Sequence, residues 1–144
     1  MTARALSIAH LLALPCTPPE LVQLAADSGC AKCGIRLLPA TPGGLHYPLM
    51  DDAALMRETL ARLHDTGVGV FDIEIVRIGE HFDPRACEAF FAAGQALGAR
   101  AVLVAGDDAN EPRLIAAFAA LCDEAAPFGL TCDLEFMPWT AVKD

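Results

Sequence analysis

The sequence predicts an α/β fold of about five parallel strands and four helices, arranged as a partial (β/α)8 TIM barrel. Gly29, Gly67, Gly98 and Gly129 each follow a helix-like stretch and precede an apolar, strand-like run. These glycines are 38, 31 and 31 residues apart, and one βα unit of such a barrel takes about 31 residues, from ~250 over eight units. Strands joined by single helices of this length run parallel, because each crossover returns the chain to the same end of the sheet.

The strands are expected in the short apolar runs that follow the glycines, with one more at the start of the chain. A loop rich in proline and glycine, residues 39–48, follows the second run, and loops at the carboxyl ends of parallel strands often carry function. The expected strands are residues 6–10, 33–38, 68–78, 101–105 and 130–136.

Each helix is expected to begin at a capping residue and to end at one of the four glycines. Thr17 and Glu20 have the spacing of a capping box, with Pro18 at the first helical position. The later helices are expected to open at Asp51 or Asp52, at Asp83-Pro84 and at Asn110. The inward faces are predicted from helical spacing as Leu21, Val22, Leu24 and Ala25; Leu55, Met56, Leu60 and Leu63; Cys87, Phe90, Phe91 and Leu97; and Leu114, Ile115, Phe118, Leu121 and Cys122.

A five-stranded doubly wound sheet is the alternative architecture for a chain of this length. Its central strands would be apolar on both faces, whereas the third strand alternates. Phe71, Ile73 and Ile75 are expected on one face, and Asp72 and Glu74 on the other.

The second and fifth strands alternate in the same way. Arg36 stands between Ile35 and Leu37, and Asp133 and Glu135 alternate with apolar neighbours. Polar residues on one face of successive strands favour a barrel interior that opens into a site. The first βα turn carries neither GxGxxG nor a P-loop, so a nucleotide fingerprint is absent there.

Length and charge narrow the class of protein. The 144 residues predict one domain, the N-terminal portion of a barrel truncated after its fifth strand. The net charge of −9 argues against nucleic-acid binding, which depends on Lys and Arg. No apolar run approaches 18 residues and no leader-like segment follows Met1, so we expect no membrane span and a cytoplasmic location.

Six cysteines are present, and two of them form a lone CxxC at Cys30 and Cys33. Such a pair suits a redox centre or half of a zinc site, but no second pair completes it, so incidental thiols are the favoured interpretation. Cys87, Cys122 and Cys132 are expected to behave as small buried hydrophobic residues.

Five ionisable residues are predicted to meet near the carboxyl ends of the strands, where barrel enzymes keep their sites. They are His10, Arg36, Glu74, Arg77 and Glu135. The carboxylate of Glu135 suits a divalent metal, Glu74 suits a substrate hydroxyl, and the two arginines suit a phosphate or carboxylate. His10 suits a hydrogen bond to substrate.

Structural roles compete with each of these. Arg36 and Glu74 can form an ion pair between adjacent strands, Arg77 can be a solvated strand end, and His10 a hydrogen-bonded core residue. Asp107 and Asp108 are expected in turn and capping roles, and Trp139 in apolar packing or at a pocket wall.

Five stretches carry a resemblance to a known family. The chain resembles the N-terminal part of the xylose-isomerase-like sugar phosphate isomerase/epimerase superfamily, whose fold is a complete barrel of roughly twice this length. The matching stretches are residues 6–10, 34–44, 72–77, 102–106 and 134–138.

The resemblance implies a divalent metal (Mn, Mg, Co or Zn), with Glu135 as the ligand from strand 5 and further ligands on strands 6 to 8. It implies proton transfer next to a carbonyl by Glu74 and Glu135 on a sugar or sugar phosphate, as isomerase, epimerase or in some members lyase chemistry. His10, Arg36 and Arg77 would bind substrate. A chain truncated after strand 5 would be inactive alone.

Two further functions remain open at this point. The edges of the first and fifth strands would be unpaired, so two copies could associate as a homodimer. A doubly wound domain would instead bind an anionic small molecule or a protein partner without catalysis.

Overall fold

The computed structural model describes residues 4–143 and contains one five-stranded sheet whose spatial order, β1-β2-β3-β4-β5, is the order of the sequence. All four pairings are parallel. The strands are β1 (Ser7–Ile8), β2 (Lys32–Arg36), β3 (Gly69–Ile78), β4 (Ala101–Gly106) and β5 (Thr131–Glu135).

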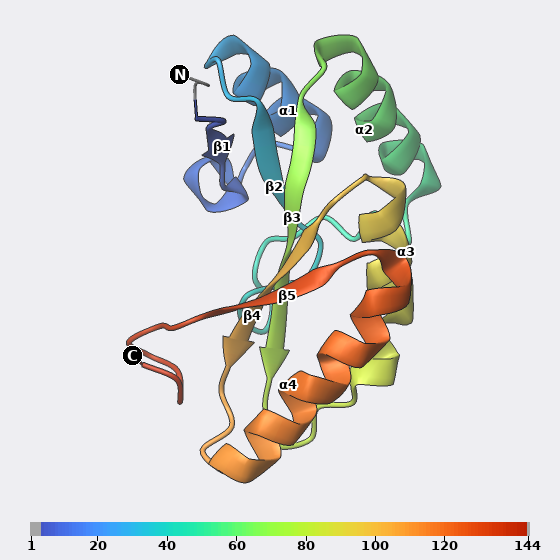
Figure 1. The fold of residues 1–144 in the computed structure, drawn as a ribbon. Coiled ribbons are helices and arrows are strands. Elements are labelled where there is room, and N and C mark those ends of the chain that lie inside the picture. The colour runs from blue at the N-terminus through green and yellow to red at the C-terminus, as the bar shows by residue number, and fades with distance from the viewer. Residues whose placement is uncertain (1–3, 144) are drawn as a thin grey trace.

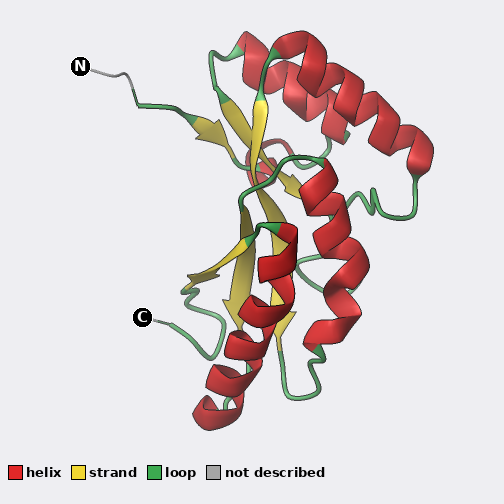
Figure 2. Cartoon of the chain, turned by 45° about the vertical axis from the view of Figure 1, so that its right-hand side comes forward, coloured by secondary structure: helices red, strands yellow, loops and turns green. Residues whose placement is uncertain are grey.

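The helices lie together on one side of the sheet (Figures 1 and 2). A doubly wound sheet needs a reversal of strand order and helices on both faces, so that alternative is wrong, and the barrel-type arrangement is confirmed. The helices are α1 (Pro18–Asp27), α2 (Ala53–Thr66), α3 (Glu88–Ala96) and α4 (Glu111–Ala125), with 3-10 turns η1 (His10–Ala13), η2 (Pro84–Cys87) and η3 (Ala126–Phe128).

Three of the four predicted helix starts are confirmed. Glu20 Oε2 accepts from the backbone N–H of Thr17 at 2.7 Å, which completes the capping box of α1. Asp52 and Asn110 cap α2 and α4 through their side-chain oxygens. The four spaced glycines have φ between 70° and 74°, a region that only glycine enters at little cost, so they can end helices where other residues would be strained.

Several predicted boundaries change. The second strand ends at Arg36 rather than at residue 38, and α4 is followed from Ala126 by the 3-10 turn η3, which Gly129 closes. The helix expected at Asp83-Pro84 starts as the 3-10 turn η2 and becomes α-helical only at Glu88. The first strand ends at Ile8 rather than His10, because the His10 imidazole, and not a backbone carbonyl, accepts the N–H of Arg36 at 2.9 Å. The His10 side chain thus takes the place of the next backbone hydrogen bond between β1 and β2.

The main core fills the space between sheet and helices, and a small second cluster lies apart from it. Ile73 belongs to the main core, but Ile75 joins Ala105 and Met137 in the second cluster. The expected common face of Phe71, Ile73 and Ile75 is therefore wrong. The pairing of β3 slips once beside Gly34 and once after Ile73, and each extra residue shifts the period-two alternation by one.

The predicted inward face of α4 is also corrected at one position. Leu114 and Leu121 are buried as expected, but Ile115 is 61% exposed. It lies at the side of the helix that faces β5 and the C-terminal segment. Within residues 4–143, no helix has the combined length and apolar character needed to cross a bilayer.

Candidate functional site

The face of the sheet opposite the helices carries a pocket of about 520 Å³. Side chains from β2, β3, β4 and the end of β5 line it, together with the loops that follow β1 and β2. Its charged residues are Arg36, Asp72, Glu74, Arg77 and Glu135. Four of the five predicted site residues are therefore brought into one pocket.

Arg36 and Glu74 form a buried ion pair on the floor of this pocket. The Glu74 carboxylate accepts two hydrogen bonds on Oε2, at 2.5 Å from Arg36 Nη2 and 3.1 Å from Nε. Their side chains are 8% and 4% exposed. The guanidinium and carboxylate compensate each other's loss of water, and breaking such a pair leaves an expensive lone charge.

His10 lies outside the pocket lining and is fully buried. Its Nδ1 accepts from the Arg36 N–H, so its Nε2 carries the proton and donates to the Cys16 carbonyl at 2.9 Å. The ring also stacks on Tyr47 at 5.1 Å between centroids. Burial lowers the pKa of His10, which keeps it neutral. This geometry favours a structural role that positions the end of β2.

Arg77 stands at the pocket rim and ties two loops together. Its Nη1 donates to Asp107 at 2.7 Å, and Nη2 donates to the Ala40 carbonyl at 3.0 Å. Asp107 thus pairs across strands, whereas Asp108 has the predicted turn role and accepts from the Asn110 N–H at 2.8 Å. The guanidinium of Arg77 already has an anionic partner before any substrate arrives.

Asp72 is the site residue that sequence reasoning left out of its candidate set. Gly34 faces it from β2, and a Cβ at that glycine would overlap Asp72 Oδ1 and lie 3.1 Å from Cγ. Burial, followed by the charges of Glu74, Asp133 and Glu135, raises the pKa of Asp72 from 3.8 to about 6. The sequence signal that could have pointed to Asp72 was Gly34, because a glycine inside a strand often marks a place where another group approaches the backbone closely.

Glu135 lies at the end of β5, where the sequence predicts it, and its side chain is exposed to the pocket. Among residues 4–143 no hydrogen bond or ion pair engages its carboxylate. The same residues contain no group of three His, Cys, Asp or Glu side chains placed to hold a metal ion. One free carboxylate does not fit a complete divalent-metal site, so the described residues supply at most part of one.

Neither cysteine of the CxxC lines this pocket. Cys30 and Cys33 are free thiols, and Cys33 is buried. Burial raises the pKa of Cys33 to about 12, which suppresses the thiolate that redox and metal chemistry require. Burial likewise raises the pKa of Cys87 to about 11 and of Cys132 to about 12, consistent with the expected hydrophobic roles.

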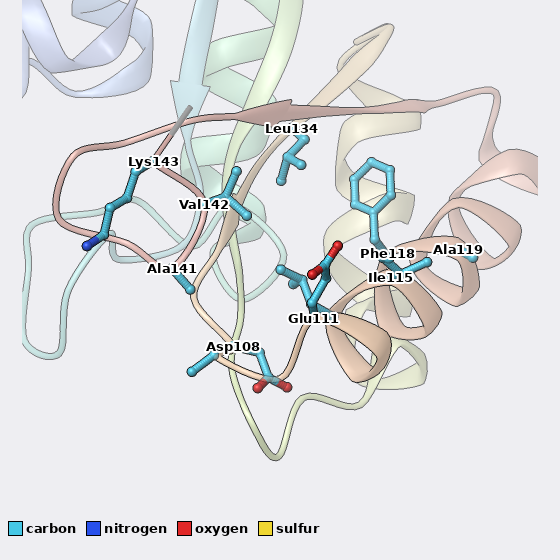
Figure 3. Close-up of a pocket in the computed structure, with 11 residues that line it drawn as sticks. Asp108, Glu111, Ile115, Phe118, Ala119, Leu134, Ala141, Val142 and Lys143 are labelled. Carbon is cyan, nitrogen blue, oxygen red and sulfur yellow. The ribbon is translucent and has the colours of Figure 1, made fainter.

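A second hollow of about 820 Å³ lies between α4 on one side and β5 with the C-terminal segment on the other. Figure 3 shows Leu134 and Val142 facing Ile115 and Phe118 across it, with the Glu111 carboxylate between them in this view. The walls are mainly apolar and carry no cluster of catalytic groups. The polar pocket therefore remains the candidate site.

Comparison with protein-family models and with curated proteins gives no match. Solved structures do match. A xylose isomerase domain-containing protein from Salmonella typhimurium has a TM-score of 0.70 at 16% identity, over 99% of this chain and 54% of that one. An IolI protein with a bound zinc atom has a TM-score of 0.68 at 17% identity, over 96% and 54%.

A xylose isomerase domain protein from Alicyclobacillus acidocaldarius has a TM-score of 0.66 at 14% identity, over 98% of this chain and 53% of that one. The chain thus spans about half the length of the structures it matches. At these identities the likeness concerns the fold. The sequential parallel sheet with helices on one face has the fold of about half of a xylose-isomerase-like barrel.

Proposed function

We propose that the polar pocket is the substrate-binding part of a sugar or sugar-phosphate isomerase or epimerase, acting by proton transfer next to a carbonyl. We propose further that complete turnover requires a complementary half-barrel, because five strands enclose the pocket on one side only. Exchange of the single proton beside the carbonyl needs only the carboxyl groups of this half. The observation that carries the proposal is the gathering of Asp72, Glu74 and Glu135 around one pocket at the barrel-interior face.

Each carboxyl group has a distinct part in this chemistry. Glu135, which has no partner among residues 4–143, takes the proton from the carbon beside the carbonyl, and the C–H electron pair forms the enediol double bond. Asp72, with its pKa at about 6, donates to the carbonyl oxygen as it gains charge. Return of the proton from Glu135 to the former carbonyl carbon, while the neighbouring hydroxyl gives its proton back to Asp72 as it becomes the new carbonyl, completes an isomerisation.

The position of the Glu74 carboxylate is constrained by its ion pair with Arg36. Its Oε2 is held by Arg36, so its Oε1 is the oxygen available to substrate. In an epimerisation Glu74 would deliver a proton of its own from Oε1 to the opposite face of the same carbon, while Glu135 keeps the proton that it removed. Arg36 fixes the carboxylate in place, and His10 fixes the backbone of Arg36, so both act as positioning residues.

The test uses hydrogen exchange and binding together. The chain is incubated with aldoses, ketoses and their phosphates in D2O, and deuterium at the carbon beside the carbonyl is followed by NMR. Binding is followed through Trp139, the single tryptophan, which lines the pocket. Glu135→Gln should keep binding and lose exchange. Absence of saturable binding by any of these sugars would overturn the proposal.

Self-association is a second candidate, favoured by the open edges and by exposed apolar side chains. In residues 4–143, β1 pairs only with β2 and β5 only with β4, and Leu12 is 79% exposed. We propose that two copies pack through these surfaces. Light scattering after size exclusion tests it: a defined dimer supports association, and a monomer across the accessible concentration range contradicts it.

A further inference from the structure

We infer that the pocket on the open face of the sheet accepts an uncharged sugar or polyol and discriminates against its phosphorylated form. This inference rests on the proposed function and selects one substrate class within it. It follows from which charges line the pocket, and from which of them already have partners.

The pocket lining has a surplus of acid. Three carboxyl groups, those of Asp72, Glu74 and Glu135, face two guanidinium groups, those of Arg36 and Arg77. A phosphate would bring further negative charge into a partly desolvated space where repulsion is poorly screened. Hydroxyl groups, in contrast, can donate to the carboxylates without that cost.

Both guanidinium groups are already committed. Arg36 is buried against Glu74, and Arg77 spans Asp107 and the Ala40 carbonyl. Phosphate binding at either would have to displace a hydrogen-bonded carboxylate from its cation. Lys32 lies over the ring of Phe71, and neither residue is part of the lining. The described lining therefore holds no cation without an acidic partner.

The rest of the lining suits the apolar face of a sugar ring. Phe136 and Trp139 are 67% and 73% exposed and stand at the pocket wall. Flat aromatic faces pack against the C–H groups of a ring while its hydroxyls bond to polar neighbours. Aromatic walls above an acidic floor are the combination expected for recognition of a neutral carbohydrate.

The acidity of the floor depends on Asp72. Its neighbours are Cys33 and Arg36 on β2, Glu74 on β3, and Asp133 and Glu135 on β5, while β4 contributes Leu103 to the pocket. The notch at Gly34 holds the carboxyl group in position. Removing its charge, with its shape retained, should therefore weaken the discrimination.

The experiment compares matched pairs: glucose with glucose 6-phosphate, and fructose with fructose 6-phosphate. Dissociation constants are measured at low salt from the fluorescence of Trp139. The free sugar of at least one pair should bind roughly tenfold more tightly than its phosphate. Raising NaCl from about 0.02 M to about 0.5 M should narrow that ratio, because salt screens repulsion.

Two variants sharpen the result. Asp72→Asn should reduce the ratio by about threefold or more. Asp123→Asn, the same charge change on exposed α4 and outside the lining, should leave the ratio unchanged. If the phosphate binds as tightly as its parent sugar, or more tightly, in both pairs, this inference alone is overturned. Failure of every sugar and every phosphate to bind overturns the proposed function and this inference with it.

Discussion

The two faces of the sheet use the same strands for opposite purposes. On the helix side, residues such as Ile35 and Ile73 are fully buried in one continuous apolar core. On the other side, Arg36 and Glu74, each next in sequence to one of those residues, are buried as a charged pair. Apolar burial stabilises the first face, whereas the second holds charge in place at an energetic cost.

The largest effect is expected from truncating the helix-side core. Phe91 is 1% exposed and packs edge-on against Phe90. Phe91→Ala should lower the free energy of unfolding by about 3–5 kcal/mol through lost burial and a residual cavity. Urea denaturation measures it. Phe136→Ala, at an exposed position on the open face, serves as the control and should cost less than about 1 kcal/mol.

Breaking the ion pair on the open face should cause the next largest loss of unfolding free energy. Glu74→Leu leaves the buried Arg36 guanidinium without its partner and should cost about 3 kcal/mol. The double variant Arg36→Met/Glu74→Leu removes both charges and should recover most of that loss. If the double variant is as unstable as the single one, an unpaired buried charge is not the cause.

Two glycines provide a matched test of the two faces. At Gly94 on α3 an added Cβ would lie 2.5 Å from Ile73 Cδ1, and at Gly34 it would overlap Asp72. Each Gly→Ala change should cost about 1–2 kcal/mol through overpacking. Only Gly34→Ala should also weaken sugar binding measured by Trp139 fluorescence. Equal losses of sugar binding in both variants would mean that any disturbance of packing weakens binding, and that Gly34 has no specific role at the pocket.

The pH dependence of stability should separate Asp72 from His10. Because the folded-state pKa of Asp72 is raised from 3.8 to about 6, the folded protein holds a proton that the unfolded chain has released between these values. Its contribution to stability is therefore lost as pH rises through this window, by about 1 kcal/mol after allowing for solvent screening.

His10 acts in the opposite direction. Burial lowers its folded-state pKa, so its contribution is present above pH 6.5 and is lost as pH falls through the lowered pKa. The difference in unfolding free energy between the wild type and Asp72→Asn, measured by urea denaturation from pH 4 to 8, isolates the Asp72 effect. A difference that does not change with pH would contradict the raised pKa.

The smallest effect is expected at the apolar hollow between α4 and the C-terminal segment. Ile115 is 61% exposed, so Ile115→Ser should change the free energy of unfolding by no more than about 0.5 kcal/mol. Leu114→Ser, one residue away but buried, should cost several times more. Thermal unfolding of the two variants compares them. Similar losses would place Ile115 in the core, as its helical spacing first indicated.

Local chemistry in the sequence was sufficient to place the secondary structure. Caps such as Asp52 and left-handed glycines such as Gly67 act within a few residues, so the elements they delimit are predictable without tertiary contacts. The alternation of polar and apolar residues around Arg36 also lies within a few residues of the chain, so it indicated the polar face of the sheet without tertiary contacts. Strand ends at β1 and the second half of β3 were not predictable, because the His10 bond and the ladder slips depend on neighbouring strands.

For this protein, the sequence by itself determined the alternating elements, their parallel direction and the polar face that became the candidate site. Only the tertiary structure decided the sequential strand order, the placement of Asp72 beside Gly34, and the commitment of both pocket arginines to acidic partners. The physical reason is the distance along the chain over which each interaction acts. Capping and periodicity act along the chain, whereas burial, charge pairing and pKa depend on residues that the fold brings together.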